Sequence, residues 1–131
     1  MEPVIASAVL SMLSAKLKSF AWKEQPSSRA ARKPDILAVN PQGQVYLVEI
    51  AVGERRVRYG EVAHVENLAN ALKEGHVHAE GSIVPVLVTD HEVSDAVEDA
   101  AKAIGIDIVE VEGSPEEIAA QIAAHLEPGS A

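Results

Sequence analysis

Residues 33–52, KPDILAVNPQGQVYLVEIAV, carry the pattern that decides the fold. Residues 36–40 and 45–52 are apolar and rich in β-branched side chains, which is typical of strands. Between them lies PQG at residues 41–43, and three-residue hairpin loops favour glycine at the last position, where the backbone needs a positive φ. The stretch therefore predicts a β-hairpin.

The hairpin also predicts which residues face each other. If Asn40 pairs with Gln44, Asp35 falls opposite Glu49, although a bulge would shift this register by one residue. Directly opposed side chains have Cβ atoms roughly 4.5–5.5 Å apart. Two carboxylates at that separation repel each other unless a cation or a proton lies between them. An acidic pair in an otherwise apolar strand setting therefore predicts a cation site.

Position 51 belongs to the same surface of the sheet. Side chains two residues apart on a strand share a face, so Leu47, Glu49 and Ala51 are expected to point the same way. If the site has a third side chain with a chemical role, we expect it at position 51. The sequence has alanine there, which carries no polar group.

These residues resemble the PD-(D/E)xK nuclease superfamily, which has the restriction-endonuclease-like, or resolvase-like, fold. The resemblance consists of the PD pair that ends at Asp35, the hairpin, and the run Glu49-Ile50-Ala51. It implies that Asp35, Glu49 and the main-chain carbonyl of Ile50 hold a divalent metal. It also implies a lysine two residues beyond the glutamate, which steadies the attacking water or the phosphate, and Ala51 departs from the motif at that point.

The chemistry that follows is phosphodiester hydrolysis. Carboxylate oxygens suit Mg²⁺ or Mn²⁺, and hydrolysis needs a metal to activate water and to neutralise charge on the phosphate oxygens. We therefore expect a metal-dependent nuclease acting on DNA, weakened or inactive because of Ala51. Three alternatives remain at that position: the lysine was removed by engineering, its role has moved to Lys33 or Arg55, or the chain is a former nuclease that only binds.

Charge is distributed unevenly along the chain. The net charge of the 131 residues is −9, yet residues 16–58 hold nine of the eleven basic residues and only four acidic ones. This asymmetry predicts a basic surface for a polyanion and an acidic back, although ordinary solvated charges would give the same pattern. Glu24 is a candidate additional metal ligand, the alternative being a surface glutamate. We expect nucleic-acid contacts from Lys16, Lys18, Arg29, Arg32, Lys33, Arg55, Arg56 and Arg58.

Helical and strand patterns alternate through the rest of the chain. Apolar spacing predicts helices over residues 3–19, 61–74, 92–104 and 116–126. Strand patterns cover residues 20–24, 82–89 and 106–111, and a further strand is indicated at 53–60. Because strands and helices alternate after the hairpin, parallel crossovers should join an antiparallel pair. The prediction is one α/β domain over residues 1–131, a sandwich with a mixed central sheet, with its core at about 18–112, a C-terminal helix at 114–126 and a loose tail at 127–131.

Local signals predict where several elements begin and end. Thr89-Asp90 is expected to cap the helix over residues 92–104, and Gly105 to end it. Ser114 and Glu117 form the sequence signature of a capping box, with proline at the first helical position between them. Pro85 indicates an edge strand or an irregularity.

Other function classes compete with the nuclease. A binding or interaction module without chemistry predicts that Asp35 and Glu49 bind no metal and that the basic stretch recognises an acidic partner. A small-molecule sensor has less support, because no GxGxxG loop follows a strand, and the HxH at residues 76–78 is interpreted as a surface loop. The chain has no cysteine, and residues 1–20 do not form a signal peptide or membrane span. We expect a cytoplasmic protein, and the resemblance implies a homodimer.

Overall fold

The computed structural model describes residues 2–14, 16–19, 34–53, 57–75 and 83–126. Over these residues the predicted alternation of helices and strands is found. The helices are α1 (Glu2–Met12), α2 (Tyr59–Gly75), α3 (Asp95–Ala103) and α4 (Pro115–Leu126). The strands are β1 (Lys18–Ser19), β2 (Ile36–Val39), β3 (Val45–Ala51), β4 (Ile83–Thr89) and β5 (Asp107–Glu110).

The strands form one mixed sheet in the order β1-β2-β3-β4-β5. The β1–β2 and β2–β3 pairs are antiparallel, and the β3–β4 and β4–β5 pairs are parallel. Each parallel pair is joined through a helix, as a parallel connection requires. The prediction of an α/β sandwich with a mixed sheet is therefore confirmed.

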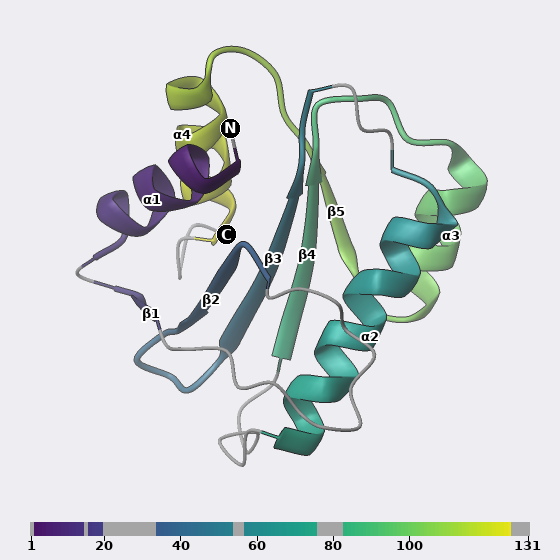
Figure 1. The fold of residues 1–131 in the computed structure, drawn as a ribbon, viewed down its shortest axis with the longest axis horizontal. Helices are drawn as coiled ribbons and strands as arrows, with labels where there is room; N and C mark the ends of the chain where they lie inside the picture. The colour runs from purple at the N-terminus through teal and green to yellow at the C-terminus, as the bar shows by residue number, and fades with distance from the viewer. Residues whose placement is uncertain (1, 15, 20–33, 54–56, 76–82, 127–131) are drawn as a thin grey trace.

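Helices cover both faces of the sheet. Figure 1 shows α1 and α4 on one side and α2 and α3 on the other. All seven residues of β3 are buried, which is the pattern of a strand covered on both faces. Val48 and Ile50 belong to the core on the α1/α4 side, whereas Leu47 and Ala51 belong to the core on the α2/α3 side.

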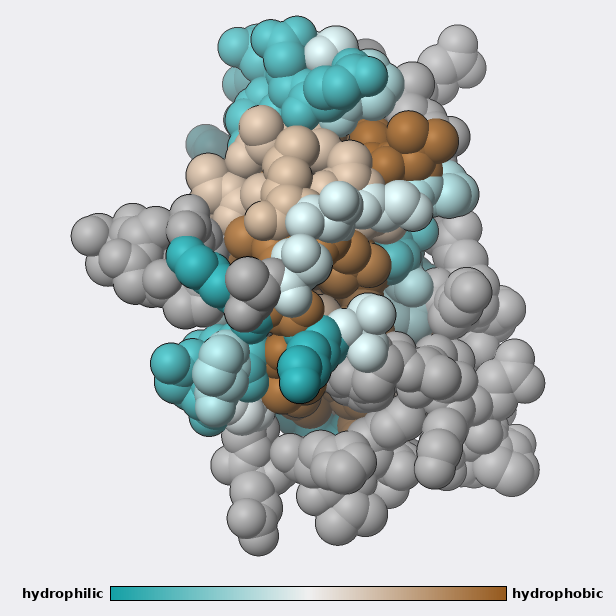
Figure 2. Space-filling view, turned by 90° about the vertical axis from the view of Figure 1, so that its left-hand side faces the viewer, coloured by the Kyte–Doolittle hydropathy of each residue, from teal (hydrophilic) through white to brown (hydrophobic). Residues whose placement is uncertain are grey.

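The outer side of α1 carries exposed apolar side chains. Val4 and Met12 are 65% and 51% exposed. Figure 2 shows this side of the molecule, where an apolar area lies between hydrophilic regions. The inner side of the same helix packs into the core through Ile5 and Val9, both of which are fully buried.

The hairpin has the predicted register. Ile36 pairs with Val48, so the extension of the ladder places Asp35 opposite Glu49. The Asn40 N–H donates to the Gln44 carbonyl at 3.0 Å and closes the loop. The last residue of the loop, Gly43, has a φ of +84°, which is the left-handed conformation predicted for this position.

The first helix is shorter than predicted. It ends at Met12 instead of residue 19, so Lys16 lies in a turn and Lys18 lies in β1, opposite Val39. The turn carries Leu17 into the α1/α4 core, where it is 4% exposed. Tertiary burial and strand pairing therefore override the helical spacing. The strand predicted at residues 20–24 lies outside the described residues.

The start of α3 also differs from the prediction. The helix begins at Asp95, and its cap is Ser94, whose Oγ accepts a hydrogen bond from the Val97 N–H at 3.3 Å. The predicted caps are engaged elsewhere: Thr89 Oγ1 accepts from the His91 N–H, and the Asp90 carboxylate accepts from the Gly53 N–H at 3.1 Å.

Four other local predictions have definite outcomes. Gly105 ends α3 at a φ of +79°, and Ser114 and Glu117 exchange the two hydrogen bonds of a capping box. The strand expected at residues 53–60 is wrong, since Gly53 is in a turn and Tyr59 begins α2. Pro85 lies in a central strand, but the β5 ladder starts only at Val86, so Pro85 has a strand partner on one side alone within the described residues.

Candidate metal and nucleic-acid site

The two predicted acidic residues lie on the same face of the sheet. Leu37 on β2 and Leu47 on β3 are paired and both pack in the α2/α3 core. Asp35 precedes Leu37 by two residues and Glu49 follows Leu47 by two, so the strand period puts both carboxylates on the α2/α3 side. This is the arrangement that the hairpin predicted.

Asp35 is fixed by the main chain of the neighbouring strand. Its Oδ2 accepts a hydrogen bond from the Ile50 N–H at 2.7 Å. In an antiparallel pair the N–H and C=O of one residue face the same neighbouring strand. The Ile50 carbonyl is therefore directed toward the β2 side as well, one residue beyond Glu49.

Glu49 is an acidic side chain in a dry position. It is 3% exposed and is flanked along β3 by Leu47 and Ala51, which are fully buried. A buried charge is costly unless it is paired or bound to a metal. Its Oε2 lies 3.7 Å from Nε2 of His64.

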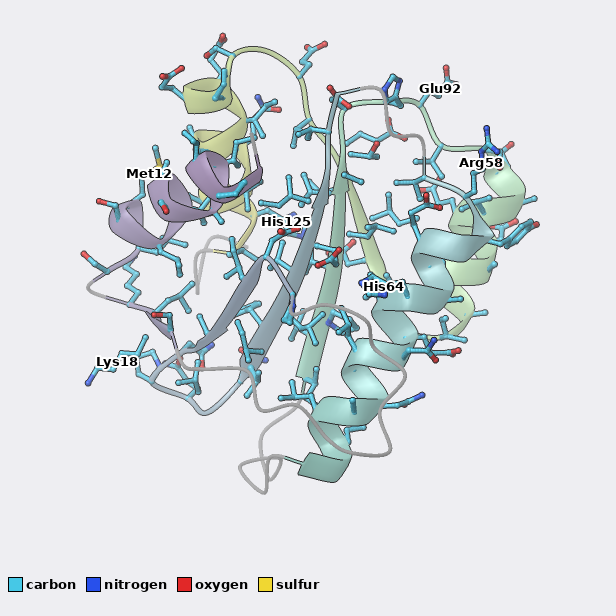
Figure 3. All side chains as sticks on the ribbon, in the orientation of Figure 1. Met12, Lys18, Arg58, His64, Glu92 and His125 are labelled. Atoms are coloured by element: carbon cyan, nitrogen blue, oxygen red, sulfur yellow. The ribbon has the colours of Figure 1, made fainter. Side chains whose placement is uncertain are left out.

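His64 is not among the site residues predicted from the sequence. Figure 3 shows it projecting from α2 toward the sheet. It precedes Leu68, which is fully buried, by four residues, so the two share one side of the helix. That spacing is the signal from which its inward position could have been predicted.

Position 51 provides no polar group. The Ala51 side chain is fully buried in the same core as Val57 and Val97, and its main chain pairs with Thr89 of β4. The surroundings of the expected lysine position are thus apolar.

Three of the basic residues predicted to contact nucleic acid are described, and all three are exposed: Lys16, Lys18 and Arg58. Lys18 lies on the edge strand β1 and Arg58 just before α2, and Figure 3 shows them on opposite sides of the molecule. The Arg58 N–H donates to Glu61 Oε2 at 2.9 Å, so that carboxylate caps α2. The other candidates lie outside the described residues: Glu24, Arg29, Arg32, Lys33, Arg55 and Arg56.

The donor set fits a hard divalent ion in residue type. Two carboxylates and a main-chain carbonyl are oxygen ligands of the kind that Mg²⁺ and Mn²⁺ take. Among the described residues, however, no group of three or more histidine, aspartate or glutamate side chains is already gathered for an ion. The candidate site is therefore the set predicted from the sequence, Asp35, Glu49 and the Ile50 carbonyl, and the structure adds the contact of His64 with Glu49.

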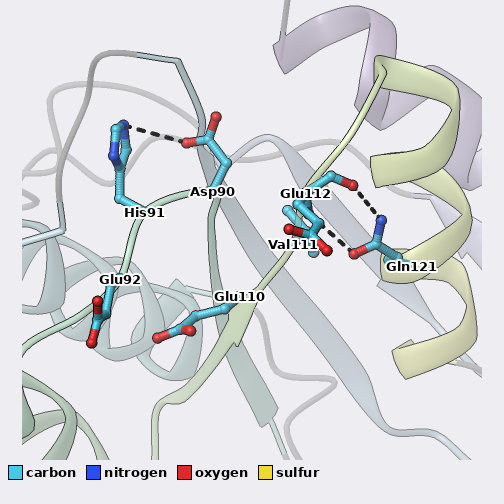
Figure 4. Close-up of a pocket in the computed structure, with 7 residues that line it drawn as sticks. All are labelled: Asp90, His91, Glu92, Glu110, Val111, Glu112 and Gln121. Atoms are coloured by element: carbon cyan, nitrogen blue, oxygen red, sulfur yellow. Dashed lines mark hydrogen bonds and ion pairs between the residues drawn. The ribbon is translucent and has the colours of Figure 1, made fainter.

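A separate pocket of about 480 Å³ opens beyond the carboxyl ends of β4 and β5 (Figure 4). Ligands in open α/β sheets commonly bind at this end of parallel strands. Four carboxylates line it together with a histidine, an amide and one valine: Asp90, Glu92, Glu110 and Glu112, with His91, Gln121 and Val111. This lining repels phosphate, and Glu49 is not part of it, so the pocket is not the predicted site.

Several of these side chains brace the loops around that pocket. Asp90 accepts from the Gly53 N–H, and His91 Nε2 contacts the Gly53 carbonyl. Gln121 donates to the Glu112 carbonyl at 2.6 Å and accepts from its N–H at 3.2 Å. These contacts give Asp90, His91 and Gln121 a structural role.

Two further findings concern the chain as a whole. In the part of the chain that the structure describes, no helix has the length and apolar content needed to cross a bilayer. Comparisons with protein-family models, with curated proteins and with solved structures gave no match.

Proposed function

We propose that this chain is a metal-dependent nuclease domain acting on DNA, in which hydrolysis is weak because Ala51 occupies the position of the motif lysine. The observation that supports this proposal most is the Asp35–Ile50 hydrogen bond of 2.7 Å. The hairpin register, which puts Asp35 opposite Glu49, supports the same choice of ligands. This is the arrangement implied by a restriction-endonuclease-like fold, which is part of the proposal.

Asp35, Glu49 and the Ile50 carbonyl would hold Mg²⁺ or Mn²⁺. The bound ion would supply activation of water and neutralisation of charge on the phosphate. The chain itself fixes the ligands: Ile50 orients Asp35 through its N–H, and the surrounding core restricts the Glu49 side chain, which is 3% exposed. Glu49 lies on a rigid strand, which holds a side chain more accurately than a loop does.

Ala51 limits the chemistry. It carries no donor for the attacking water or the phosphate, and the core around it is apolar. Loss of one electrostatic donor costs on the order of 10²–10³-fold in rate, whereas metal binding needs only the acidic pair and the carbonyl. We therefore expect metal and DNA binding with slow cleavage.

DNA would be attracted by the basic part of the chain. Residues 16–58 carry nine basic and four acidic residues, while the remainder is strongly acidic. The exposed Lys16, Lys18 and Arg58 supply phosphate contacts on the described surface. A cytoplasmic location and a homodimer that meets both strands of a duplex complete the proposal.

The test is a cleavage assay on single-stranded, duplex and branched DNA, with Mg²⁺ and with Mn²⁺. It compares the wild-type chain with Ala51→Lys and with Ala51→Lys/Asp35→Ala. The nuclease proposal expects Ala51→Lys to cut DNA and the double variant not to cut. Calorimetry of metal binding to the wild type and to Asp35→Ala covers the case in which Ala51→Lys does not fold.

A module that only binds would give a different result. It has some support, because the buried Glu49 already contacts His64 without any ion. In that case the wild type binds no divalent metal, Ala51→Lys folds without cutting, and any DNA binding is unaffected by Asp35→Ala. This set of results would overturn the nuclease proposal.

A further inference from the structure

The contact between Glu49 and His64 bears on which ion the site takes. Glu49 Oε2 and His64 Nε2 are 3.7 Å apart. Two donor atoms that bind the same ion are separated by at most the sum of their two bond lengths, about 4.2 Å for nitrogen and oxygen ligands. The separation of these two atoms therefore allows one ion to contact both. Asp35 does not form a ready group of three with them, so its carboxylate would join the ion on binding.

The imidazole is held beside the carboxylate. The His64 side chain is 21% exposed and the Glu49 side chain 4% exposed, while the Nε2 atom that faces Glu49 is buried. The helix that carries His64 is anchored to the sheet by Val65 and Leu68, both fully buried. The nearby acidic Glu61 is engaged at the start of α2 with the Arg58 N–H. His64 is thus held beside Glu49 by a fixed element.

A nitrogen ligand changes the preference among divalent ions. Carboxylate and carbonyl oxygens suit Mg²⁺ and Mn²⁺ alike, whereas imidazole binds first-row transition ions better than it binds Mg²⁺. We propose that His64 is a ligand of the ion held by Asp35 and Glu49, and that it makes the site prefer Mn²⁺ over Mg²⁺. This inference rests on the proposed function, because it assigns the metal class of the same site.

A purely structural contact is the competing explanation. In that case His64 stabilises the buried Glu49 in the metal-free protein and takes no part in binding an ion. Removing it would change stability, and it would change the affinities for Mn²⁺ and Mg²⁺ by the same factor. The ratio of the two affinities therefore separates the explanations.

The experiment is titration calorimetry of the full chain with Mn²⁺ and, separately, with Mg²⁺, for the wild type and His64→Gln. Glutamine keeps much of the size and polarity of histidine but lacks the imidazole nitrogen. The expected result is a loss of Mn²⁺ affinity of about 10-fold or more with little change for Mg²⁺. Pulsed electron paramagnetic resonance of bound Mn²⁺ should show a nitrogen coupling in the wild type that is absent in His64→Gln.

The matched control is His125→Gln. His125 Nε2 contacts Asp107 Oδ2 at 2.5 Å, so it also forms an imidazole–carboxylate pair, but on the surface between α4 and β5. This variant should bind both ions like the wild type. A loss of Mn²⁺ affinity as large as that of His64→Gln would point to adventitious binding by histidines and would overturn the assignment.

The outcomes separate this inference from the function on which it rests. If the wild type binds neither ion, both the nuclease proposal and the role of His64 are overturned. If it binds both ions, and Asp35→Ala abolishes binding while His64→Gln leaves the Mn²⁺ to Mg²⁺ ratio unchanged, only the role of His64 is overturned.

Discussion

The carboxylate of Asp35 accepts a hydrogen bond from the main-chain N–H of Ile50 at 2.7 Å. This contact joins the residue before β2 to the residue after Glu49 on β3. It ties the side chain of one predicted metal ligand to the backbone of another. The register of the hairpin thus sets the candidate site, with Asp35 in the bend directly before β2.

Asp35 should contribute to stability as well as to metal binding. Asp35→Ala removes a hydrogen bond to a charged acceptor, which we expect to cost about 1.5–3 kcal/mol of unfolding free energy in urea denaturation. Asp35→Asn keeps an oxygen acceptor for the Ile50 N–H and should lose less stability, yet bind metal weakly, because the charge is gone. Wild-type metal affinity in Asp35→Asn would contradict the assignment.

Ala51→Lys should lower the free energy of unfolding and raise the rate of DNA cleavage. A lysine in this fully buried position overpacks the core, and we expect a loss of about 1–3 kcal/mol in unfolding free energy. Cleavage should rise on the order of 10²–10³-fold, because the new ammonium stabilises charge at the phosphate. The control is Ala51→Met, which adds similar bulk without charge and should lose stability with no gain in cleavage. An equal gain in both variants would exclude the electrostatic explanation.

Gly43 should be required for the hairpin that sets the register. Gly43→Ala places a side chain at a φ of +84°, which we expect to cost about 1–2 kcal/mol in thermal or urea unfolding. Gly60→Ala is the matched control, since Gly60 lies in α2 with open space around it and its φ is not positive. That variant should be neutral or slightly stabilising. Equal losses in the two variants would argue against the role of the loop conformation.

The capping box of α4 should lose strength in acid. The main-chain N–H of Ser114, and then its hydroxyl, lower the pKa of Glu117 below its usual 4.5. A carboxyl with a lowered folded-state pKa stabilises the fold above its unfolded pKa, and this contribution disappears as the pH falls through the folded value. Thermal unfolding of wild type and Glu117→Gln should differ at pH 7 and converge in acid below that folded value. A difference that stays constant throughout would contradict the lowered pKa.

DNA binding should depend on salt through the basic residues. Removing one phosphate contact lowers the slope of log affinity against log salt by about 1. We expect this for Arg58→Ala in fluorescence anisotropy with duplex DNA. Lys102→Ala, an exposed basic residue on α3 outside the basic stretch, should leave the slope unchanged. A lower slope for Lys102→Ala with an unchanged slope for Arg58→Ala would place the DNA surface on α3.

Local chemistry explains which predictions from the sequence are confirmed. The hairpin register, Gly43, Gly105 and the Ser114–Glu117 capping box depend on residues close together in the chain. Predictions fail where a distant segment competes for the same residues. The first helix stops at Met12 because Leu17 is needed in the core and Lys18 pairs with β2, and Asp90 does not cap α3 because it binds Gly53.

Strand period and turn chemistry act over a few residues, so the mixed α/β sandwich and the facing pair Asp35 and Glu49 can be predicted from the sequence. The contact of His64 with Glu49, fifteen residues earlier in the chain, is visible only in the folded protein. The direction in which a helix packs against a sheet depends on the burial of all its apolar residues together. No spacing within α2 alone specifies which strand residue His64 will meet.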